Sequence, residues 1–168
     1  MLHVFSDLEG IRIAIEMERR GESFYRRAAR VSHTPETVEL LEALAGDERT
    51  HRAEFEKLYA AESNGGLSDD AYDDETNAYL TAIAADVVFP RGLVDLRDEG
   101  FENPAGVLRS AISSEKDSIL FYTELLGHTL DPRAREIFWE IARQERGHLY
   151  RLQKQLERIA DSKESNHS

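Results

Sequence analysis

Two copies of the pattern Glu-x-x-His lie 97 positions apart in this sequence. The first copy is Glu48 with His51, and the second is Glu145 with His148. On an α-helix, residues three apart lie on the same face, so each copy can present a carboxylate and an imidazole to one point. Taken alone the pattern is weak evidence, because a third copy at residues 164–167 lies in a polar C-terminal tail.

The repeat extends beyond this pattern. At the same offset, Glu18 aligns with Glu115 and Tyr25 aligns with Tyr122. Each half therefore has one glutamate on its first helix and Glu-x-x-His on its second. If the halves pack around a pseudo-two-fold axis, all six groups come to one level of the core. We predict that these six side chains bind metal: Glu18, Glu48, His51, Glu115, Glu145 and His148.

Four carboxylates and two imidazoles are the ligand set expected of di-iron and di-manganese helix bundles. Carboxylates bind oxidised iron and bridge two ions, and each imidazole supplies one nitrogen. The alternative is a core of satisfied ion pairs. It is disfavoured because four carboxylates without cations would repel one another and be costly to desolvate, and neither lysine nor arginine interrupts these stripes. We predict two Fe ions, with Mn as the alternative metal.

Four neighbouring residues are candidates for supporting roles. Asp47 and Gln144 each precede a predicted ligand glutamate, and could accept a hydrogen bond from a histidine of the opposite half. Tyr25 and Tyr122 lie two helical turns beyond the first glutamate of each half, and could hydrogen-bond near the site. The open alternatives are an exposed polar position for the first pair and an ordinary core tyrosine for the second.

Capping signals predict the helices that position these groups. Ser6 with Glu9 forms a capping box, and prolines begin three further helices at Pro35, Pro104 and Pro132. Each helix has an apolar stripe at spacings of three and four, which a predicted ligand interrupts near its middle. These patterns predict an all-α four-helix bundle, with helices at about 7–31, 35–62, 104–126 and 132–160.

The chain is predicted to be a single domain over residues 1–168. It comprises a helix pair at 7–62, a crossover at 63–103, a second helix pair at 104–160 and a frayed polar tail at 161–168. Short connections make each pair antiparallel, and the crossover is long enough for a short extra helix at 75–88. A flexible crossover also permits two chains to exchange helix pairs, so we expect a homodimer, either swapped or unswapped.

Composition excludes several classes of function. The chain has 21 Lys and Arg against 33 Asp and Glu, so its net charge of −12 disfavours nucleic-acid binding. It has no cysteine, which excludes thiolate zinc and iron–sulfur sites within it. No apolar run approaches the roughly 20 residues of a membrane span, and the N-terminus lacks a signal-peptide pattern. We expect a cytoplasmic protein that contacts neither nucleic acid nor membrane.

The paired motifs resemble those of the rubrerythrin branch of the ferritin-like superfamily, over roughly residues 7–160. The motifs are Glu18-x₆-Tyr25, Glu48-Arg-Thr-His51, Glu115-x₆-Tyr122 and Glu145-Arg-Gly-His148. The resemblance implies a ferritin-like bundle with a non-haem di-iron centre that reacts with hydrogen peroxide or dioxygen, in a dimer. Two departures stand out. The rubredoxin domain is missing, and Ser118 stands where rubrerythrins tend to carry an additional glutamate.

These observations predict a di-iron oxidoreductase that reduces hydrogen peroxide or dioxygen. Because the chain lacks its own rubredoxin domain, the electrons must come from a separate donor, such as a rubredoxin-type protein. One alternative is a ferroxidase or iron-handling protein, and another is a non-catalytic metal-binding module. A closed cage in solution would indicate iron storage, and slow metal exchange without redox activity would indicate the non-catalytic module.

Overall fold

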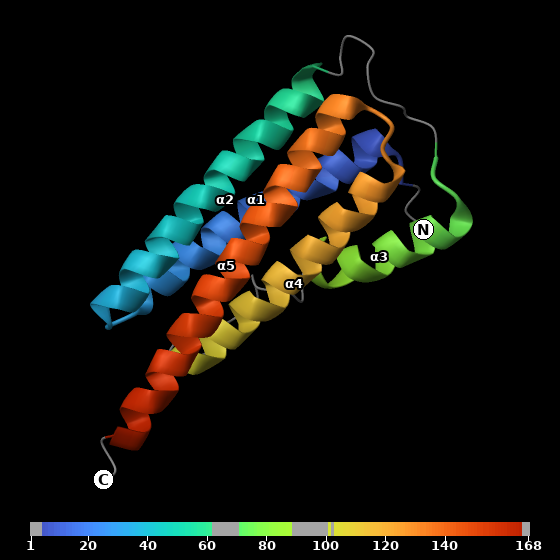
Figure 1. Ribbon diagram of the computed structural model, residues 1–168. Coiled ribbons are helices and arrows are strands. Elements are labelled where there is room, and N and C mark those ends of the chain that lie inside the picture. Colours follow the sequence, from blue (N-terminus) through green and yellow to red (C-terminus); the bar gives the residue numbers. More distant parts are fainter. Residues whose placement is uncertain (1–4, 62–70, 89–100, 102, 166–168) are drawn as a thin grey trace.

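The computed structural model describes residues 5–61, 71–88, 101 and 103–165, and these residues form a helical bundle (Figure 1). Helix α1 covers Asp7–Val31, α2 covers Pro35–Ala61, α3 covers Asp74–Val88, α4 covers Pro104–His128 and α5 covers Pro132–Ser165. The described residues include no strand. The predicted all-α fold class is confirmed.

Side-chain caps begin three of the helices where the sequence predicts. Ser6, Asn103 and Asp131 each accept a hydrogen bond from the backbone amide three residues later, at 3.2, 3.2 and 2.7 Å. The first amides of a helix have no partner inside the helix, so each cap stabilises the helix start that it satisfies.

The last helix is longer than predicted. It ends at Ser165 rather than at about Ala160, so the prediction of a frayed tail is wrong for residues 161–165. No glycine or proline interrupts this polar stretch, and the Ser162 hydroxyl donates to the Arg158 carbonyl oxygen at 2.8 Å. Figure 1 shows this end of α5 projecting past the other helices. Residues 166–168 lie outside the described residues.

The bundle consists of two helix pairs. Helix α1 packs along α2, and α4 packs along α5, while contacts of α1 with α4 and of α2 with α5 join the pairs. The approach of α1 to α4 is close at Gly10, where a Cβ atom would lie 2.6 Å from Leu125 Cδ2. A larger residue at this position would require the Leu125 side chain to shift.

Two apolar clusters fill the core, one toward each end of the bundle. The cluster that includes residues of α3 is called the α3 end, and its members include Phe55, Leu80, Phe121, Tyr122 and Phe138. The other is called the distal end, and its members include Phe24, Tyr25, Leu41, Leu108 and Leu152. Residues that the repeat makes equivalent fall at opposite ends, as Tyr25 and Tyr122 do.

Helix α3 lies beside the bundle and packs against α1 and α4 (Figure 1). Leu80 of α3 is fully buried there. Just before α3, the Tyr72 hydroxyl donates to the Asp7 carboxylate, which also accepts from Thr129 Oγ1 at 2.9 Å. The extra helix predicted within the crossover is therefore present. The rest of the predicted 63–103 crossover, apart from residues 71–88, 101 and 103, lies outside the described residues.

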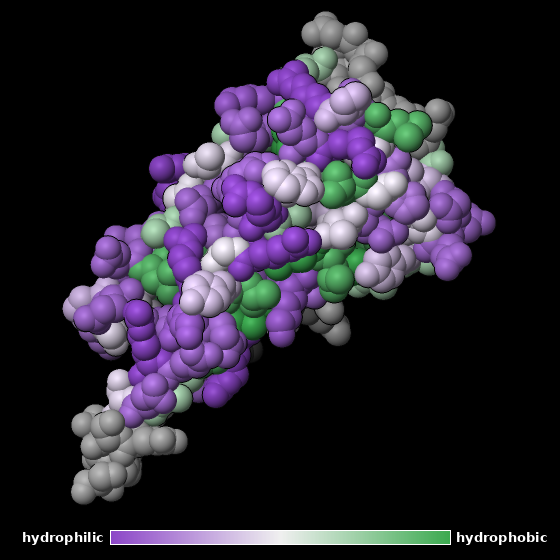
Figure 2. All heavy atoms as spheres, viewed as in Figure 1, coloured by the Kyte–Doolittle hydropathy of each residue, from purple (hydrophilic) through white to green (hydrophobic). Residues whose placement is uncertain are grey.

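The surface face seen in Figure 2 is largely hydrophilic, with hydrophobic side chains in small separate patches. Among the described residues, no helix combines the length and the apolar character needed to cross a membrane.

Candidate metal centre

The six predicted ligands lie together in the middle of the bundle, and none is more than 6% exposed. They form two overlapping groups of four, and within each group the candidate ligand atoms all lie within 4.8 Å of one another. One group is Glu18, Glu48, His51 and Glu145, and the other is Glu48, Glu115, Glu145 and His148. Two glutamates, Glu48 and Glu145, belong to both groups.

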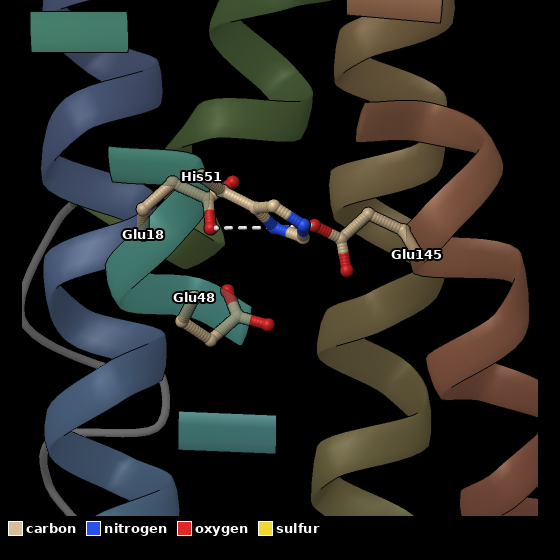
Figure 3. A group of neighbouring side chains, drawn as sticks. All are labelled: Glu18, Glu48, His51 and Glu145. Atoms are coloured by element: carbon tan, nitrogen blue, oxygen red, sulfur yellow. Dashed lines mark ion pairs between the residues drawn. The ribbon is translucent and has the colours of Figure 1, made fainter. Parts of the chain in front are cut away.

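All four long helices supply side chains to this centre. Figure 3 shows the first group, with Glu18 on α1, Glu48 and His51 on α2, and Glu145 reaching across from α5. The helical spacing of three accounts for the pairing of each glutamate with its histidine on one face. Helix packing then brings the two faces together, as the repeat predicts.

Each histidine points its Nδ1 atom at the carboxylates. His51 Nδ1 lies 2.9 Å from Glu145 Oε1 and 3.4 Å from Glu18 Oε2. His148 Nδ1 lies 2.8 Å from Glu145 Oε2 and 3.2 Å from Glu48 Oε1. The two rings stack with their centroids 5.5 Å apart. Nδ1 is therefore the nitrogen that each histidine can offer to a metal.

The donor atoms of the centre are suited to hold metal. Six of them are buried without a hydrogen-bond partner: Glu18 Oε2, Glu48 Oε1, Glu145 Oε1, Glu145 Oε2, His51 Nδ1 and His148 Nδ1. Buried polar atoms are almost always satisfied in folded proteins, so a cluster of unsatisfied ones that face one another is consistent with a metal site. Carboxylate oxygen and imidazole nitrogen suit iron and manganese.

The other nitrogen of each histidine contacts the residue that the sequence indicated. His51 Nε2 lies 3.0 Å from Gln144 Oε1, and His148 Nε2 lies 3.2 Å from Asp47 Oδ2. Each contact crosses from one half of the repeat to the other. Because both partner atoms are acceptor oxygens, each Nε2 carries a hydrogen and donates it to them, which holds each ring in its orientation.

Both candidate tyrosines also contact the centre, again across the repeat. The Tyr25 hydroxyl donates to Glu115 Oε1, and the Tyr122 hydroxyl donates to Glu18 Oε1. Burial and the neighbouring carboxylates raise the pKa of both phenols well above the usual value, so both stay protonated. Each tyrosine thus fixes one oxygen of a glutamate that belongs to only one of the two groups.

Burial and the charges within the centre raise the pKa of several of its members. Burial, reinforced by the charge of Glu145, raises the pKa of Glu115 to about 8, and burial raises that of Glu48 as well. Burial alone would lower the pKa of His51, but contacts with Glu145 and Glu18 raise it to about 11. The centre therefore holds protons at neutral pH when no metal is bound, and metal binding must release them.

Three supporting residues were not predicted. Arg151 donates to Asp47 Oδ2 at 2.8 Å, and Glu140 accepts from Gln144 Nε2 at 3.0 Å. At Gly21 on α1, a Cβ atom would lie 2.9 Å from Glu48 Oε2, so the glycine leaves room for that carboxylate. The only available signal was the repeat, which pairs Gly21 with another small residue, Ser118.

Glu22 lies one turn from Glu18 and is 8% exposed, yet it belongs to neither group. Arg52 donates to its carboxylate at 2.7 Å, and Arg26 lies 2.7 Å from its other oxygen. Two cations already satisfy this glutamate.

Known proteins share this fold. A hypothetical protein from Pyrococcus furiosus aligns with a TM-score of 0.70 at 24% identity, over 94% of this chain and 92% of its own. A protein from Thermotoga maritima, described as a ferritin-like diiron-carboxylate protein, aligns with a TM-score of 0.69 at 25% identity, over 92% of this chain and 97% of its own. A DUF305 fragment from Deinococcus radiodurans aligns with a TM-score of 0.63 at 15% identity, over 90% of this chain and 95% of its own. No curated protein matches the chain in sequence.

The rubrerythrin family model matches residues 9–90 and 106–168. The match covers both helix pairs and all six residues of the centre. Together with the buried cluster of glutamates and histidines, it shows that this chain is a member of the rubrerythrin family.

Proposed function

We propose that this protein is a di-iron oxidoreductase that reduces hydrogen peroxide with electrons from a separate donor protein. The observation that carries the proposal is the pair of overlapping four-residue groups, which share Glu48 and Glu145. Shared carboxylates can bridge two ions and hold them close enough to act on one substrate. Glu18 and His51 would complete one metal position, and Glu115 and His148 the other.

Two ferrous ions bound here would supply the two electrons that, with two protons, convert one hydrogen peroxide into two waters. The chain itself provides a buried site, with every predicted ligand nearly inaccessible to solvent. Tyr25 and Tyr122 hold the carboxylates of Glu115 and Glu18 in place. None of these 168 residues is a cysteine that could hold a rubredoxin-type iron, and the proposal assigns the return of the electrons to a separate donor protein.

The test is anaerobic loading with ferrous iron, followed by rapid mixing with hydrogen peroxide and, separately, with dioxygen. Near-ultraviolet absorbance reports the oxidation of iron. We expect two irons per chain and a much faster reaction with peroxide. The variant Glu39→Gln, which removes an exposed carboxylate from α2, is the matched control and should behave like the parent.

Other outcomes of the same experiment would replace the proposal. A faster reaction with dioxygen followed by iron release would indicate a ferroxidase, and native mass would then show whether the chains form a cage or the expected homodimer. Two bound metal ions that never change oxidation state would indicate a non-catalytic metal-binding module.

A further inference from the structure

The two candidate metal positions have equivalent ligands but different groups behind their histidines. Asp47 and Gln144 occupy equivalent positions of the repeat, and each contacts the Nε2 atom of the opposite histidine. His148 therefore donates to a carboxylate, whereas His51 donates to a neutral amide oxygen. The repeat, which preserves all six predicted ligands, is broken at this pair of contacts.

A carboxylate accepts a hydrogen bond more strongly than an amide does. When it accepts from the Nε2–H of an imidazole, it draws the proton toward itself and makes the opposite nitrogen a stronger metal ligand. Nδ1 is the nitrogen that faces the centre in both histidines. The Asp47 carboxylate should therefore strengthen metal binding by His148, and Gln144 should do less for His51.

Arg151 contacts Asp47 and Glu140 contacts Gln144, and these contacts reduce the difference in metal binding between the two histidines without removing it. Arg151 donates to the same oxygen of Asp47 that contacts His148, but the side chains of Arg151 and Asp47 are 40% and 42% exposed, so water weakens this ion pair. On the other side, the carboxylate of Glu140 reaches His51 only through the Gln144 amide. Within the described part of the chain, Asp47 remains the only carboxylate in direct contact with a histidine Nε2 of the centre.

We infer that Asp47 makes the Glu115–His148 position the tighter of the two, so that it fills first. This inference rests on the proposed two-metal centre. Asp47 acts as a positioning residue, because it contacts the histidine and none of the predicted metal-binding atoms. The Glu18–His51 position is the weaker one, and it exchanges its ion more readily.

Single-position variants test the inference with Co(II) as the probe, at fixed pH. Glu18→Ala leaves the Glu115–His148 position complete, and Glu115→Ala leaves the other. We expect each variant to bind one Co(II), with at least roughly tenfold tighter binding in Glu18→Ala. Calorimetry gives the affinity, the visible absorbance of bound Co(II) reports coordination, and circular dichroism verifies that each variant is folded.

Asp47→Asn then removes the carboxylate with little change of shape. In the Glu18→Ala background it should weaken Co(II) binding about 10-fold or more, and in the Glu115→Ala background it should change binding roughly two-fold at most. Gln144→Glu is the converse change and should tighten binding in the Glu115→Ala background. Glu39→Gln in both backgrounds controls for the loss of one negative charge from α2.

The possible failures are distinguishable. Equal Co(II) affinity of Glu18→Ala and Glu115→Ala overturns the inference, as does equal weakening of both by Asp47→Asn, while the two-metal centre itself stands. If the unmodified protein binds no Co(II) at all, both the inference and the proposed centre are wrong.

Discussion

The two ends of the bundle are equivalent by the repeat but packed with different side chains. At the α3 end, the rings of Phe55 and Phe138 lie 5.6 Å apart. The equivalent positions at the distal end hold Leu152 and Leu41, which are also fully buried. Apolar volume can be redistributed within a core as long as it stays well packed, whereas metal ligands cannot be exchanged in this way. The six predicted ligands between the two ends are accordingly the symmetric part of the molecule.

A polar contact adds to the difference between the ends. At the distal end, Gln155 Nε2 donates to Thr37 Oγ1 at 2.8 Å, and both residues are buried. The equivalent residues at the α3 end are Leu58 and Ala134, which belong to its apolar cluster. Since a buried amide needs a partner, Gln155 and Thr37 must be present together.

Glu48→Gln should have the largest effect, because it changes the centre that both ends share. Glu48 belongs to both groups of four, so we expect metal binding at both positions to be lost. The metal-free variant should be no less stable than the metal-free parent, because one carboxylate whose pKa burial raises has been removed. Metal content after dialysis and thermal unfolding with a chelator are the measurements.

Glu145→Gln is the matched change in the other half, and we expect it also to lose metal binding at both positions. Two tightly bound ions in either variant would contradict the role assigned to the shared glutamates.

Truncation of equivalent core positions compares the packing of the two ends. Phe138→Ala should lower the free energy of unfolding by about 4 kcal/mol, and Leu41→Ala by about 3 kcal/mol, through lost burial and the cavity left behind. Both side chains are 1% exposed. Urea denaturation of the metal-free protein measures both losses. A loss below about 1 kcal/mol in either variant would mean that the surrounding side chains move in to fill the cavity.

A double-mutant cycle tests the polar contact of the distal end. Thr37→Ala should destabilise the protein by about 2 kcal/mol, because it leaves the Gln155 amide buried without its partner. Adding Gln155→Leu gives the distal end the residues found at the α3 end, and should restore most of this loss. Equal stability of the single and double variants, measured by urea denaturation, would show that Gln155 finds another partner.

The affinity of the centre for ferrous iron should rise with pH. His51, with a pKa of about 11, and Glu115, with a pKa of about 8, are protonated at neutral pH in the metal-free protein. Metal binding displaces these protons, so each displaced proton makes binding about tenfold weaker per unit of falling pH, about 1.4 kcal/mol. Anaerobic competition with a calibrated chelator between about pH 6 and 8 measures this slope. Affinity that does not depend on pH would contradict the protonated state of the metal-free centre.

The parts of the fold that depend on residues close in sequence were predictable, and the parts that depend on distant contacts were not. Ser6, Asn103 and Asp131 cap helices that begin as predicted, because a cap depends on residues only three positions away. The end of α5 was predicted too early, because residues 161–165 are polar but carry no signal that stops a helix. The placement of α3 beside the bundle depends on contacts such as Tyr72 with Asp7, which are distant in sequence.

The residues of the candidate site also divide into those that the sequence indicated and those that it did not. The repeat indicated Asp47 and Gln144 as partners of the opposite histidines, and the contacts have that arrangement. Arg151 and Glu140 behind them have no equivalents in the repeat, since the matching positions 54 and 43 hold a glutamate and an alanine. Without an equivalent, a charged helix residue cannot be told from an ordinary surface residue.

The sequence by itself selected the six side chains of the centre. A helical period of 3.6 places Glu18, Glu48, His51 and their equivalents on core-facing stripes, and the offset of 97 places them at one level. Only the tertiary structure decided that Glu48 and Glu145 are common to both groups and that Nδ1 faces inward. These features depend on the rotation and stagger of four helices against one another, and packing across the core sets both.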